Sequence, residues 1–408
     1  MTAAPIPPRF ARLVLVTPQG EAVGALPPLM VETPWWQDAE PVVRAAREHY
    51  HIEVTILRLL ETELTVPHGG AVTYLAEVAG PVASEVWHGV LDDHPLRMMW
   101  ARPGGPSADV AWAESLLAQG GMRRIGPAEQ VRSWNLSSLW RLPVEGQIMW
   151  LKCVPPFFAH EGRILHRLQG RPVPTLISHD GPRLLMAEIP GDDLYDARLP
   201  TLLEMLRLLV ALQREWSGRT DELLALGLPD WRAPSLARAI ASVVERVGPN
   251  LTTEDRAMLD RFVAALEERF KQIASCGLPD TLVHGDFHPG NFRGNDTALV
   301  LLDWGDCCIG HPMLDEPAFL DRVMADGVET VRRHWHAEWR RALPGSDPDR
   351  ASLLLQPVAA ARQAVVYQTF LDNIEPSEQR YHEADPADWL ARAAGLIRDE
   401  ASEAAQSP

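Results

Sequence analysis

Residues 282–292 read LVHGDFHPGNF, and this segment restricts the fold more than any other part of the chain. It lies between two apolar stretches and contains two histidines, an aspartate, an asparagine, two glycines and a proline. Glycine and charged side chains lose much conformational freedom when they are ordered. The segment is therefore expected to form a loop with a fixed shape, required either by a turn or by a reaction.

Three oxygen-bearing side chains are associated with this loop. Asp286 and Asn291 are five positions apart, and Asp303 comes near the end of the apolar stretch ALVLLDW. A strand there would deliver Asp303 to a strand end, while the glycines and the proline hold the loop. A small number of hard oxygen ligands, with room left for water and phosphate, suits Mg²⁺. The sequence predicts that the three side chains converge on such a site.

Size and charge restrict the class of protein. A chain of 408 residues exceeds the size of a single hydrophobic core, so two or three domains are expected. The net charge of −17 argues against a nucleic-acid partner, because nucleic-acid binding depends on clustered Lys and Arg. An acidic protein favours cationic ligands instead, although charge alone locates no site.

The sequence contains no signal for a membrane or for secretion. No apolar run has the length of a spanning helix, and the start MTAAPIPPRFARLVLV has neither a charged leader nor a small-residue cleavage site. The four cysteines form no CxxC pair, which suits a reducing compartment, and they are expected to be packing residues. The chain is predicted to be cytoplasmic, with no membrane partner; its oligomeric state cannot be read from the sequence.

Lysine is rare in this chain. Of 38 basic residues only Lys152 and Lys271 are lysines, and the remainder are arginines. A lysine kept against this bias indicates a site that needs a compact ammonium group rather than a planar guanidinium. Chance is the simpler explanation for Lys271, which lies in the polar helical stretch EERFKQIAS.

The first 105 residues are predicted to form a small α/β or α+β domain. Residues 9–16 and 71–79 have strand patterns, and PVVRAAREHY between them has a helical one. Arg47-Glu48 resembles the RE pair of the Nudix box, but the rest of the box is absent, and His51 and Ile52 stand where its glutamate pair would be. The resemblance implies at most a Nudix-like fold that is inert as a hydrolase.

Residues 106–191 are predicted to hold an antiparallel sheet made of EQVRSW, LWRLPV and QIMWLKCV, with Lys152 in the third strand. In the following helix, PPFFAHEGRILHRLQG, Glu161 shares a face with apolar residues, so a partner is expected, and Lys152 is the nearest candidate. A plain ion pair is the alternative to a functional pair. Residues 192–398 are predicted to be mainly helical.

The spacing of Asp286 and Asn291 matches the protein-kinase catalytic loop, H-R-D-x-x-x-x-N. HGDFHPGN followed by LDWGD resembles the pattern of the aminoglycoside phosphotransferase and choline kinase family, small-molecule kinases with a protein-kinase-like fold. The resemblance covers about residues 126–375. It implies an α+β bilobal fold, with a small antiparallel β N-lobe and a mainly helical C-lobe, following the N-terminal domain.

The resemblance also implies a role for each matching residue. Asp286 would be the catalytic base, His284 would support the loop, and Asn291 and Asp303 would bind Mg²⁺. Lys152 would hold the α- and β-phosphates of ATP or GTP, and Glu161 would orient it. Backbone groups around Glu188 and Ile189, in LLMAEIPG, would contact the base of the nucleotide as a hinge between lobes.

The chain departs from the kinase pattern at the phosphate loop. No GxGxxG precedes Lys152, and the corresponding turn reads SWNLSS. In that turn the polar side chains could donate hydrogen bonds to phosphate, or the segment could be an ordinary hairpin turn. The residues concerned are Ser133, Asn135, Ser137 and Ser138.

The predicted function is transfer of the γ-phosphate to a hydroxyl of a small molecule, which would be aminoglycoside-like, an amino alcohol or a sugar. The net negative charge of the chain slightly favours a cationic acceptor. Helix residues Arg362, Gln368 and Asp372 are candidates for the acceptor pocket, and Asp315 is expected to cap a helix and brace the loop.

Two alternatives stay open. The unusual phosphate turn would also fit a non-catalytic nucleotide sensor of the same fold. HGDFH alone would fit a transition-metal hydrolase built from His284, Asp286 and His288. Such a hydrolase would need neither Asn291 nor the pair of Lys152 and Glu161.

Overall fold

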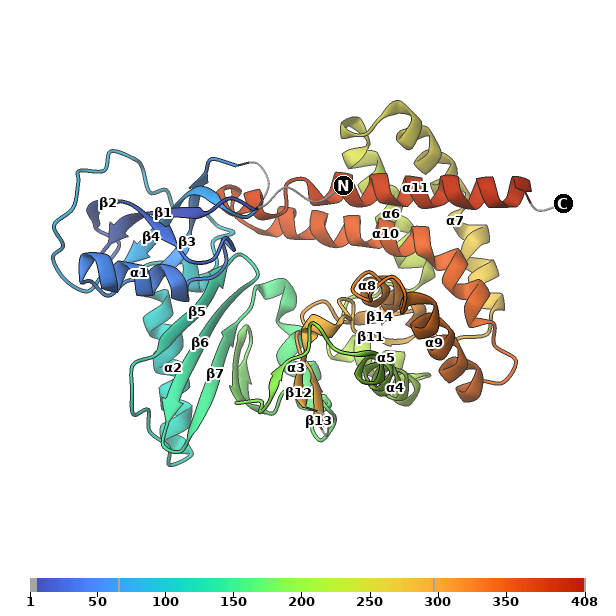
Figure 1. Ribbon diagram of the computed structural model, residues 1–408, viewed down its shortest axis with the longest axis horizontal. Helices are drawn as coiled ribbons and strands as arrows, with labels where there is room; N and C mark the ends of the chain where they lie inside the picture. Colours follow the sequence, from blue (N-terminus) through green and yellow to red (C-terminus); the bar gives the residue numbers. More distant parts are fainter. Residues whose placement is uncertain (1–5, 65–66, 296–297, 407–408) are drawn as a thin grey trace. The chain divides into compact units, whose positions relative to one another are not determined.

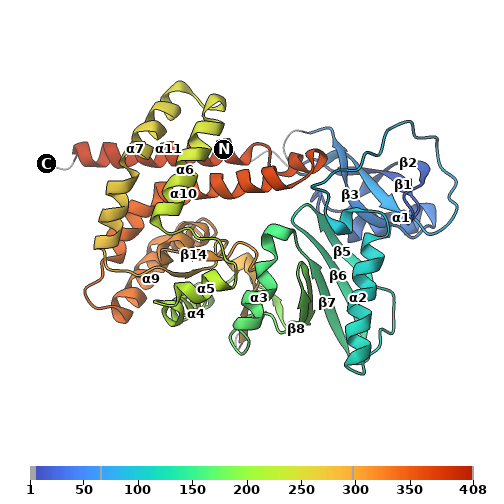
Figure 2. The same ribbon diagram turned by 180° about the vertical axis from the view of Figure 1, so that it is seen from behind.

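The computed structural model describes residues 6–64, 67–295 and 298–406, and it contains both sheets and helices (Figure 1). Figure 2 gives the same view from behind. The chain divides into two compact units. Unit 1 comprises Met1–Gly162, Thr175–Glu188 and Leu371–Glu383, and unit 2 comprises Arg163–Pro174, Ile189–Phe370 and Ala384–Pro408. The predicted boundary at residue 105 falls inside unit 1.

Unit 1 begins with a mixed four-stranded sheet in the order β2-β1-β4-β3. Its elements are β1 (Arg9–Val16), β2 (Ala22–Val31), α1 (Glu40–Tyr50), β3 (Thr55–Thr62) and β4 (Gly70–Glu77). β1 runs parallel to β4, and the other pairs are antiparallel. The expected strands and helix are thus confirmed as β1, β4 and α1. β2 carries two adjacent prolines, which an edge strand tolerates because one side of it needs no ladder hydrogen bonds.

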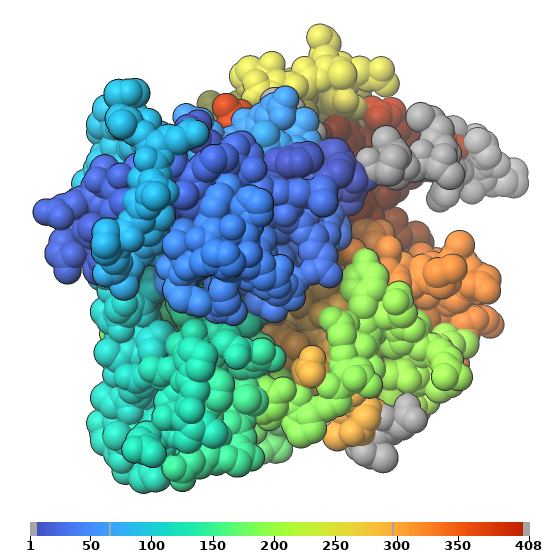
Figure 3. All heavy atoms as spheres, turned by 60° about the vertical axis from the view of Figure 1, so that its left-hand side comes forward, coloured from blue at the N-terminus to red at the C-terminus, as the bar shows by residue number. Residues whose placement is uncertain are grey.

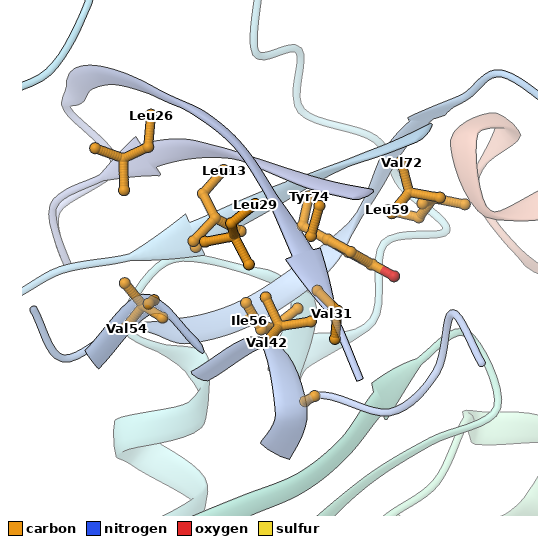
Figure 4. Packing of buried hydrophobic residues seen from close by; sticks show 14 of the residues in the cluster. Leu13, Leu26, Leu29, Val31, Val42, Val54, Ile56, Leu59, Val72 and Tyr74 are labelled. Atoms are coloured by element: carbon orange, nitrogen blue, oxygen red, sulfur yellow. The ribbon is translucent and has the colours of Figure 1, made fainter. Parts of the chain in front are cut away.

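The N-terminal sheet has its own hydrophobic core. Alternate residues of β1 point to one face of the sheet, where Leu13 packs with Val42 of α1 and Ile56 of β3 (Figure 4). Val14, on the other face of β1, belongs to a second, smaller cluster. A strand that is buried on both faces needs an almost continuous apolar sequence, which RFARLVLV supplies.

The second sheet of unit 1 has five antiparallel strands in the order β5-β6-β7-β9-β8. These strands are β5 (Glu129–Trp134), β6 (Ser137–Val144), β7 (Gln147–Cys153), β8 (Leu176–Asp180) and β9 (Arg183–Ala187). The helices nearby in sequence are η1 (Met99–Ala101), α2 (Gly105–Gln119), η2 (Pro156–Phe158) and α3 (His160–Arg167). The expected antiparallel sheet is confirmed. In the space-filling view the N-terminal residues, in blue, lie against the teal residues of this sheet (Figure 3).

Unit 2 is mainly helical, as predicted. Its helices are α4 (Leu199–Trp216), α5 (Thr220–Ala225), α6 (Ala233–Val247), η3 (Gly248–Asn250), α7 (Thr253–Ser275), η4 (Pro289–Asn291), η5 (Pro312–Asp315), α8 (Glu316–Leu320), α9 (Val328–Ala342), α10 (Pro348–Asn373) and α11 (Asp385–Gln406). Its short strands are β10 (Asp192–Asp193), β11 (Thr281–Val283), β12 (Phe292–Asn295), β13 (Ala298–Leu301) and β14 (Cys308–Gly310). Of the helices in the described part of the chain, none combines the length and the hydropathy needed to span a membrane.

A C-terminal segment returns to unit 1. η6 (Pro376–Tyr381) follows α10, and its Glu378 is almost fully buried. The backbone N–H of Leu59 in β3 donates to Glu378 Oε1 at 2.6 Å. Burial raises the pKa of this carboxyl to about 8, and the nearby charge of Glu375 acts in the same direction, while the Leu59 hydrogen bond and Arg58 oppose the rise. Glu378 is therefore protonated in the folded protein at neutral pH.

We expect the Glu378→Gln variant to change how stability depends on pH. Between pH 4.5, the ordinary pKa, and pH 8, the folded chain holds a proton that the unfolded chain releases. The Glu378 contribution therefore falls by about 1.4 kcal/mol for each pH unit as the pH rises. Glutamine cannot titrate, but its amide oxygen still accepts from Leu59. Urea unfolding at pH 5, 6, 7 and 8 should show the variant gaining stability relative to the wild type; equal pH slopes for the two proteins would contradict the assignment.

Candidate functional site

The HGDFHPGN loop begins at the end of a buried strand. All three residues of β11 are buried, and β11 pairs antiparallel with β14. The chain then passes through the loop and η4 into β12, which pairs with β13. Gly285 has φ +89°, and a Cβ there would lie 2.2 Å from the backbone oxygen of Asp306. Only glycine fits this close approach.

Two buried side chains hold the start of the loop. Asp315 Oδ2 accepts from the N–H of His284 at 3.0 Å, and its Oδ1 accepts from the N–H of Gly285 at 2.8 Å. From α10, Arg362 Nη1 donates to the Gly285 carbonyl at 3.2 Å. Backbone groups that are fixed by buried charged partners are strongly restricted. The loop is therefore held in one shape before any ligand binds.

Asp286 and Asn291 are in direct contact, as their spacing suggested. Asn291 Nδ2 donates to Asp286 Oδ2 at 3.0 Å and to the Asp286 carbonyl at 2.8 Å. The Asp286 side chain keeps 42% of its surface exposed. Both hydrogen bonds use the nitrogen of the Asn291 amide, so the amide oxygen is the atom that could bind a metal ion.

Asp286 is ionised at neutral pH. Burial by itself would raise the pKa of the Asp286 carboxyl, but the hydrogen bond and charge of His288, together with the hydrogen bond from the Asn291 amide, hold that pKa below its ordinary value. His288 Nε2 lies 3.5 Å from Asp286 Oδ2. A carboxylate with a low pKa is a weak base. It can nevertheless orient a hydroxyl group by accepting a hydrogen bond from it.

Asp303 follows β13 in a left-handed backbone conformation, with φ +56°. Such a conformation is uncommon for a residue other than glycine, and it is enriched at functional sites. The N–H of Leu302, just before it, donates to the Asn291 carbonyl at 2.7 Å. The backbone next to Asp303 is therefore joined to that of Asn291. An exposed carboxylate and an amide oxygen form a donor set that fits Mg²⁺.

His284 also connects the HGDFHPGN loop to the segment that follows β13. Its ring is fully buried, and Nε2 lies 2.8 Å from the Leu302 carbonyl. Burial lowers the pKa of His284, so the ring is neutral and Nε2 carries the donated proton. Trp304 packs edge-on against this ring, with 4.8 Å between centroids. These contacts join the loop to the segment after β13, and the supporting role of His284 stays a prediction.

Lys152 and Glu161 form the predicted pair, and both belong to unit 1. Lys152 Nζ on β7 lies 2.7 Å from Glu161 Oε1 on α3. The side chains are 14% and 2% exposed, respectively. Desolvating two charges costs free energy that their attraction often does not recover, so a buried pair is weak evidence for stability. A functional role for the pair stays a prediction, with a plain ion pair as the alternative.

Comparison with known proteins identifies the region that carries these residues. Residues 154–354 match the model of the "Phosphotransferase enzyme family". This region belongs to that family. The predicted relationship to aminoglycoside phosphotransferases and choline kinases is confirmed over these residues, as is the prediction of a small-molecule phosphotransferase. A search of the curated proteins found no match.

Several solved structures are similar to this chain. A macrolide 2'-phosphotransferase of type I is 17% identical, with a TM-score of 0.50, and the match covers 71% of this chain and 97% of that one. An aminoglycoside 2'-phosphotransferase-IIIa, in its GDP complex, is 16% identical (TM-score 0.47, 72% and 99% covered). A choline/ethanolamine kinase family protein from Mesorhizobium loti is 14% identical (TM-score 0.45, 71% and 99% covered). The first of these comparisons confirms the protein-kinase-like fold.

The polar side chains of the β5–β6 turn form hydrogen bonds within unit 1. Ser133 Oγ donates to the Leu57 carbonyl at 3.3 Å, and Asn135 Nδ2 donates to the Glu378 carbonyl at 2.9 Å. The hydroxyl oxygens of Ser137 and Ser138 accept from tryptophan ring nitrogens at 3.0 and 2.9 Å. All four residues are buried. Their contact with phosphate stays a prediction, and backbone N–H groups are the better candidates for it.

The predicted hinge coincides with the division between the two units, which falls between Glu188 and Ile189. The N–H of Glu188 donates to the Ile148 carbonyl at 3.3 Å, and the Glu188 carboxylate accepts from Trp150 Nε1. The carbonyl of Ile189 accepts from Arg293 Nε at 2.9 Å. Binding of the nucleotide base by these backbone groups stays a prediction.

Two expectations need correction. Arg362 was expected to line the acceptor pocket, but it is 2% exposed and hydrogen-bonds to the HGDFHPGN loop. Asp315 braces the loop as expected but makes no side-chain capping bond to α8, because both of its oxygens are used by the loop. Sequence spacing along a helix predicts a shared face, but it does not say what that face contacts. Gln368 is half-buried and Asp372 is exposed, and their acceptor roles stay predictions.

Two residues near the loop were missed from the sequence. Burial raises the pKa of Tyr367 on α10, and the negative charges of Asp385, Asp286 and Asp306 add to the effect, so Tyr367 lies within electrostatic range of the predicted base. Tyr195 packs against the loop, because a Cβ on Gly290 would lie 2.8 Å from its ring. The only available signal was that Tyr367 lies on the helix already considered for the acceptor.

The alternative of a transition-metal site finds little support. His284 is buried and directed to Leu302, and His288 Nδ1 accepts from the N–H of Gly290 at 3.0 Å. Within residues 6–64, 67–295 and 298–406, no three His, Cys, Asp or Glu side chains are arranged to hold a metal ion. The proposed Mg²⁺ site is of another kind, since it takes an asparagine and leaves positions to nucleotide and water.

Proposed function

We propose that the chain transfers the terminal phosphoryl group of ATP or GTP to a hydroxyl of a small molecule, with Mg²⁺ as cofactor. The observation that carries the proposal is the contact between ionised Asp286 and Asn291 on a loop held by Asp315 and Arg362. That loop lies in the region that belongs to the phosphotransferase family. A rigid loop suits this chemistry, because phosphoryl transfer depends mainly on positioning and electrostatics.

In this proposal Asp286 accepts a hydrogen bond from the acceptor hydroxyl and directs its oxygen at the γ-phosphorus. The hydroxyl oxygen forms a new P–O bond to the γ-phosphorus. The P–O bond that joins the γ-phosphorus to the β-phosphate lies in line with it and breaks. Because its pKa is low, Asp286 takes the hydroxyl proton late, when the attacking oxygen has become acidic. Mg²⁺, held by Asn291 and Asp303, would neutralise charge on the phosphates.

Lys152 would supply positive charge to the α- and β-phosphates. Glu161 keeps the ammonium group oriented through the 2.7 Å contact. Lysine suits this role because it presents a compact charge on a flexible stem, whereas the arginine fork would need two aligned acceptors. The rarity of lysine in the chain agrees with a specific requirement at this position.

The acceptor would bind beside Asp286, near Tyr367, Tyr195 and Asp306. Tyr367 and Asp306 are half-buried, and Tyr195 is about half exposed, at 49%. Two aromatic rings and two carboxylates favour an acceptor that carries an amino group, such as an aminoglycoside or an amino alcohol. A neutral sugar or a macrolide is the other outcome that a substrate screen can give.

The N-terminal domain would take no part in diphosphate hydrolysis. The Nudix-like pair Arg47-Glu48 lacks the glutamates that would bind metal ions, and Arg47 instead pairs with Glu53 at 2.6 Å on the surface. Its Nudix-like character therefore rests on that short pair.

The proposal is tested in two steps with the full chain. Isothermal titration calorimetry with ATP and GTP, each with and without Mg²⁺, should show Mg²⁺-dependent binding. A screen for ADP or GDP release against aminoglycosides, macrolides, amino alcohols and sugars should then identify an acceptor. A chain that binds neither nucleotide would refute the kinase proposal. Binding without turnover on any acceptor would favour the nucleotide sensor, and ester hydrolysis with Zn²⁺ or Mn²⁺ and no nucleotide would favour the hydrolase.

A further inference from the structure

The turn between β5 and β6, residues 134–137, is held by a segment from the far end of the chain. We call residues 374–382 the strap; it contains η6 and joins α10 to α11. The turn, the strap and the N-terminal sheet all belong to unit 1. In the proposed function this turn lies over the phosphates of the nucleotide, because it precedes the strand that carries Lys152. The inference below therefore rests on the proposed function.

The strap is fixed to the N-terminal domain. Besides the bond from Leu59 to Glu378, Arg97 Nη2 lies 2.8 Å from Glu375 Oε2, and both of these side chains are below 10% exposed. Tyr381 is buried in the core of the N-terminal domain, edge-on to Trp36 with 5.7 Å between centroids. Buried ion pairs and aromatic contacts of this kind hold a segment in a single conformation.

The strap also holds the tip of the turn. Asn135 is 2% exposed, and its Nδ2 donates to the Glu378 carbonyl at 2.9 Å. His382 Nε2 lies 3.3 Å from Asn135 Oδ1. Because an amide oxygen only accepts, Nε2 is the donor, and both polar atoms of the Asn135 amide then have a hydrogen bond. The neighbouring Trp134 ring packs on Tyr381 at 5.6 Å and on His382 at 5.8 Å. The strap thus contacts both Trp134 and Asn135 at the tip of the turn.

A second attachment lies further back, in the middle of β5. Gln130 Nε2 donates to the Ile56 carbonyl at 2.7 Å, and Gln130 Oε1 accepts from the Ile56 N–H at 2.8 Å. Gln130 is 5% exposed. It therefore resembles Asn135 in chemistry, burial and number of bonds, but it lies away from the tip.

The sequence of the turn explains why such support is needed. Kinase phosphate loops are usually rich in glycine, which lets their backbone approach the phosphates closely. Residues 133–138 contain no glycine. A turn with bulky side chains reaches a phosphate-binding shape only if its neighbours hold it there, and prior ordering of this kind lowers the entropy lost on binding.

We propose that Asn135 and His382 are positioning residues for the nucleotide, which they serve by fixing the β5–β6 turn through the strap. The N-terminal domain contributes to nucleotide affinity in this way, because it anchors the strap, although it supplies no group that touches the nucleotide. Neither residue is a catalytic residue.

The test compares Asn135→Leu with the matched control Gln130→Leu in the full chain. Each variant removes one buried amide and two hydrogen bonds, so each should lower Tm by a similar amount. If the inference is right, Asn135→Leu raises the Kd and the KM for the nucleotide about tenfold, which corresponds to one to two such bonds. The KM for the acceptor should stay unchanged, and Gln130→Leu should change all three constants less than about twofold.

His382 provides a second arm in case Asn135→Leu does not fold. His382→Ala should raise the KM for the nucleotide, and His382→Gln, which keeps a donor, should restore most of it. Equal effects of Asn135→Leu and Gln130→Leu on nucleotide KM would overturn the inference, and so would no effect of either. In those cases the wild type still binds nucleotide and the proposed function stands. If the wild type binds no nucleotide, the proposed function fails first and the inference with it.

Discussion

We expect Asp286→Asn to lower kcat by about 10³-fold and to leave nucleotide affinity within about twofold. Asparagine keeps the shape of the side chain and can still contact Asn291, but it has no negative charge to accept the acceptor proton. Since the loop is held at His284 and Gly285 by Asp315, its shape should not depend on this charge. The measurement is steady-state kinetics with the acceptor found in the screen, together with calorimetry for the nucleotide.

His288→Gln is the matched control for this prediction. His288 lies in the same loop, 3.5 Å from Asp286, and its replacement also removes a neighbour that stabilises the carboxylate. We expect a decrease in kcat of less than about tenfold, because the charge of Asp286 itself remains. A loss as large as that of Asp286→Asn would instead support a metal site that includes His288.

We expect Lys152→Met to lower kcat/KM for the nucleotide by about 100-fold and also to destabilise the fold. The catalytic loss comes from the missing positive charge at the phosphates. The loss of stability comes from Glu161, which is 2% exposed and is left without the ammonium group. Breaking a buried pair in this way costs about 3 kcal/mol. Kinetics and urea unfolding measure the two effects separately.

The double variant Lys152→Met/Glu161→Gln separates catalysis from stability. Removing the second charge should restore most of the lost stability, because the buried charge of Glu161 is then removed together with that of Lys152. Activity should stay low, since the phosphates still lack their cation. A double variant that regains both stability and activity would show that Lys152 and Glu161 form a plain ion pair.

The catalytic loop could be predicted because its information is local. Asp286 and Asn291 are close in sequence, their spacing fits one chemistry, and the following apolar strand leads to Asp303. Lys152 and Glu161 were also predictable, since a strand and the helix after it bring the two side chains together. In each case the residues and their order along the chain were sufficient to predict a contact.

The supports of the site were harder to predict. Arg362 has the helical spacing of an acceptor-pocket residue, yet it contacts the carbonyl of Gly285, 77 positions earlier. Asn135 was expected either to contact phosphate or to belong to an ordinary hairpin turn, and its side chain pairs with Glu378, 243 positions later. Nothing in the sequence near either residue specifies such a partner, because the partner is set by packing between distant segments. A polar residue in a turn has the same local pattern whether it faces a ligand or the protein.

The strap also determines when unit 1 can be completed during synthesis. Leu59 and Glu378 are separated by 319 positions, and the residues between them include Ile189–Phe370 of unit 2. Domains usually fold in the order in which they leave the ribosome. Here the N-terminal sheet emerges first, but Tyr381, part of its core, is made only after those residues of unit 2. The N-terminal sheet is therefore translated before those residues of unit 2 but can reach its final packing only after them.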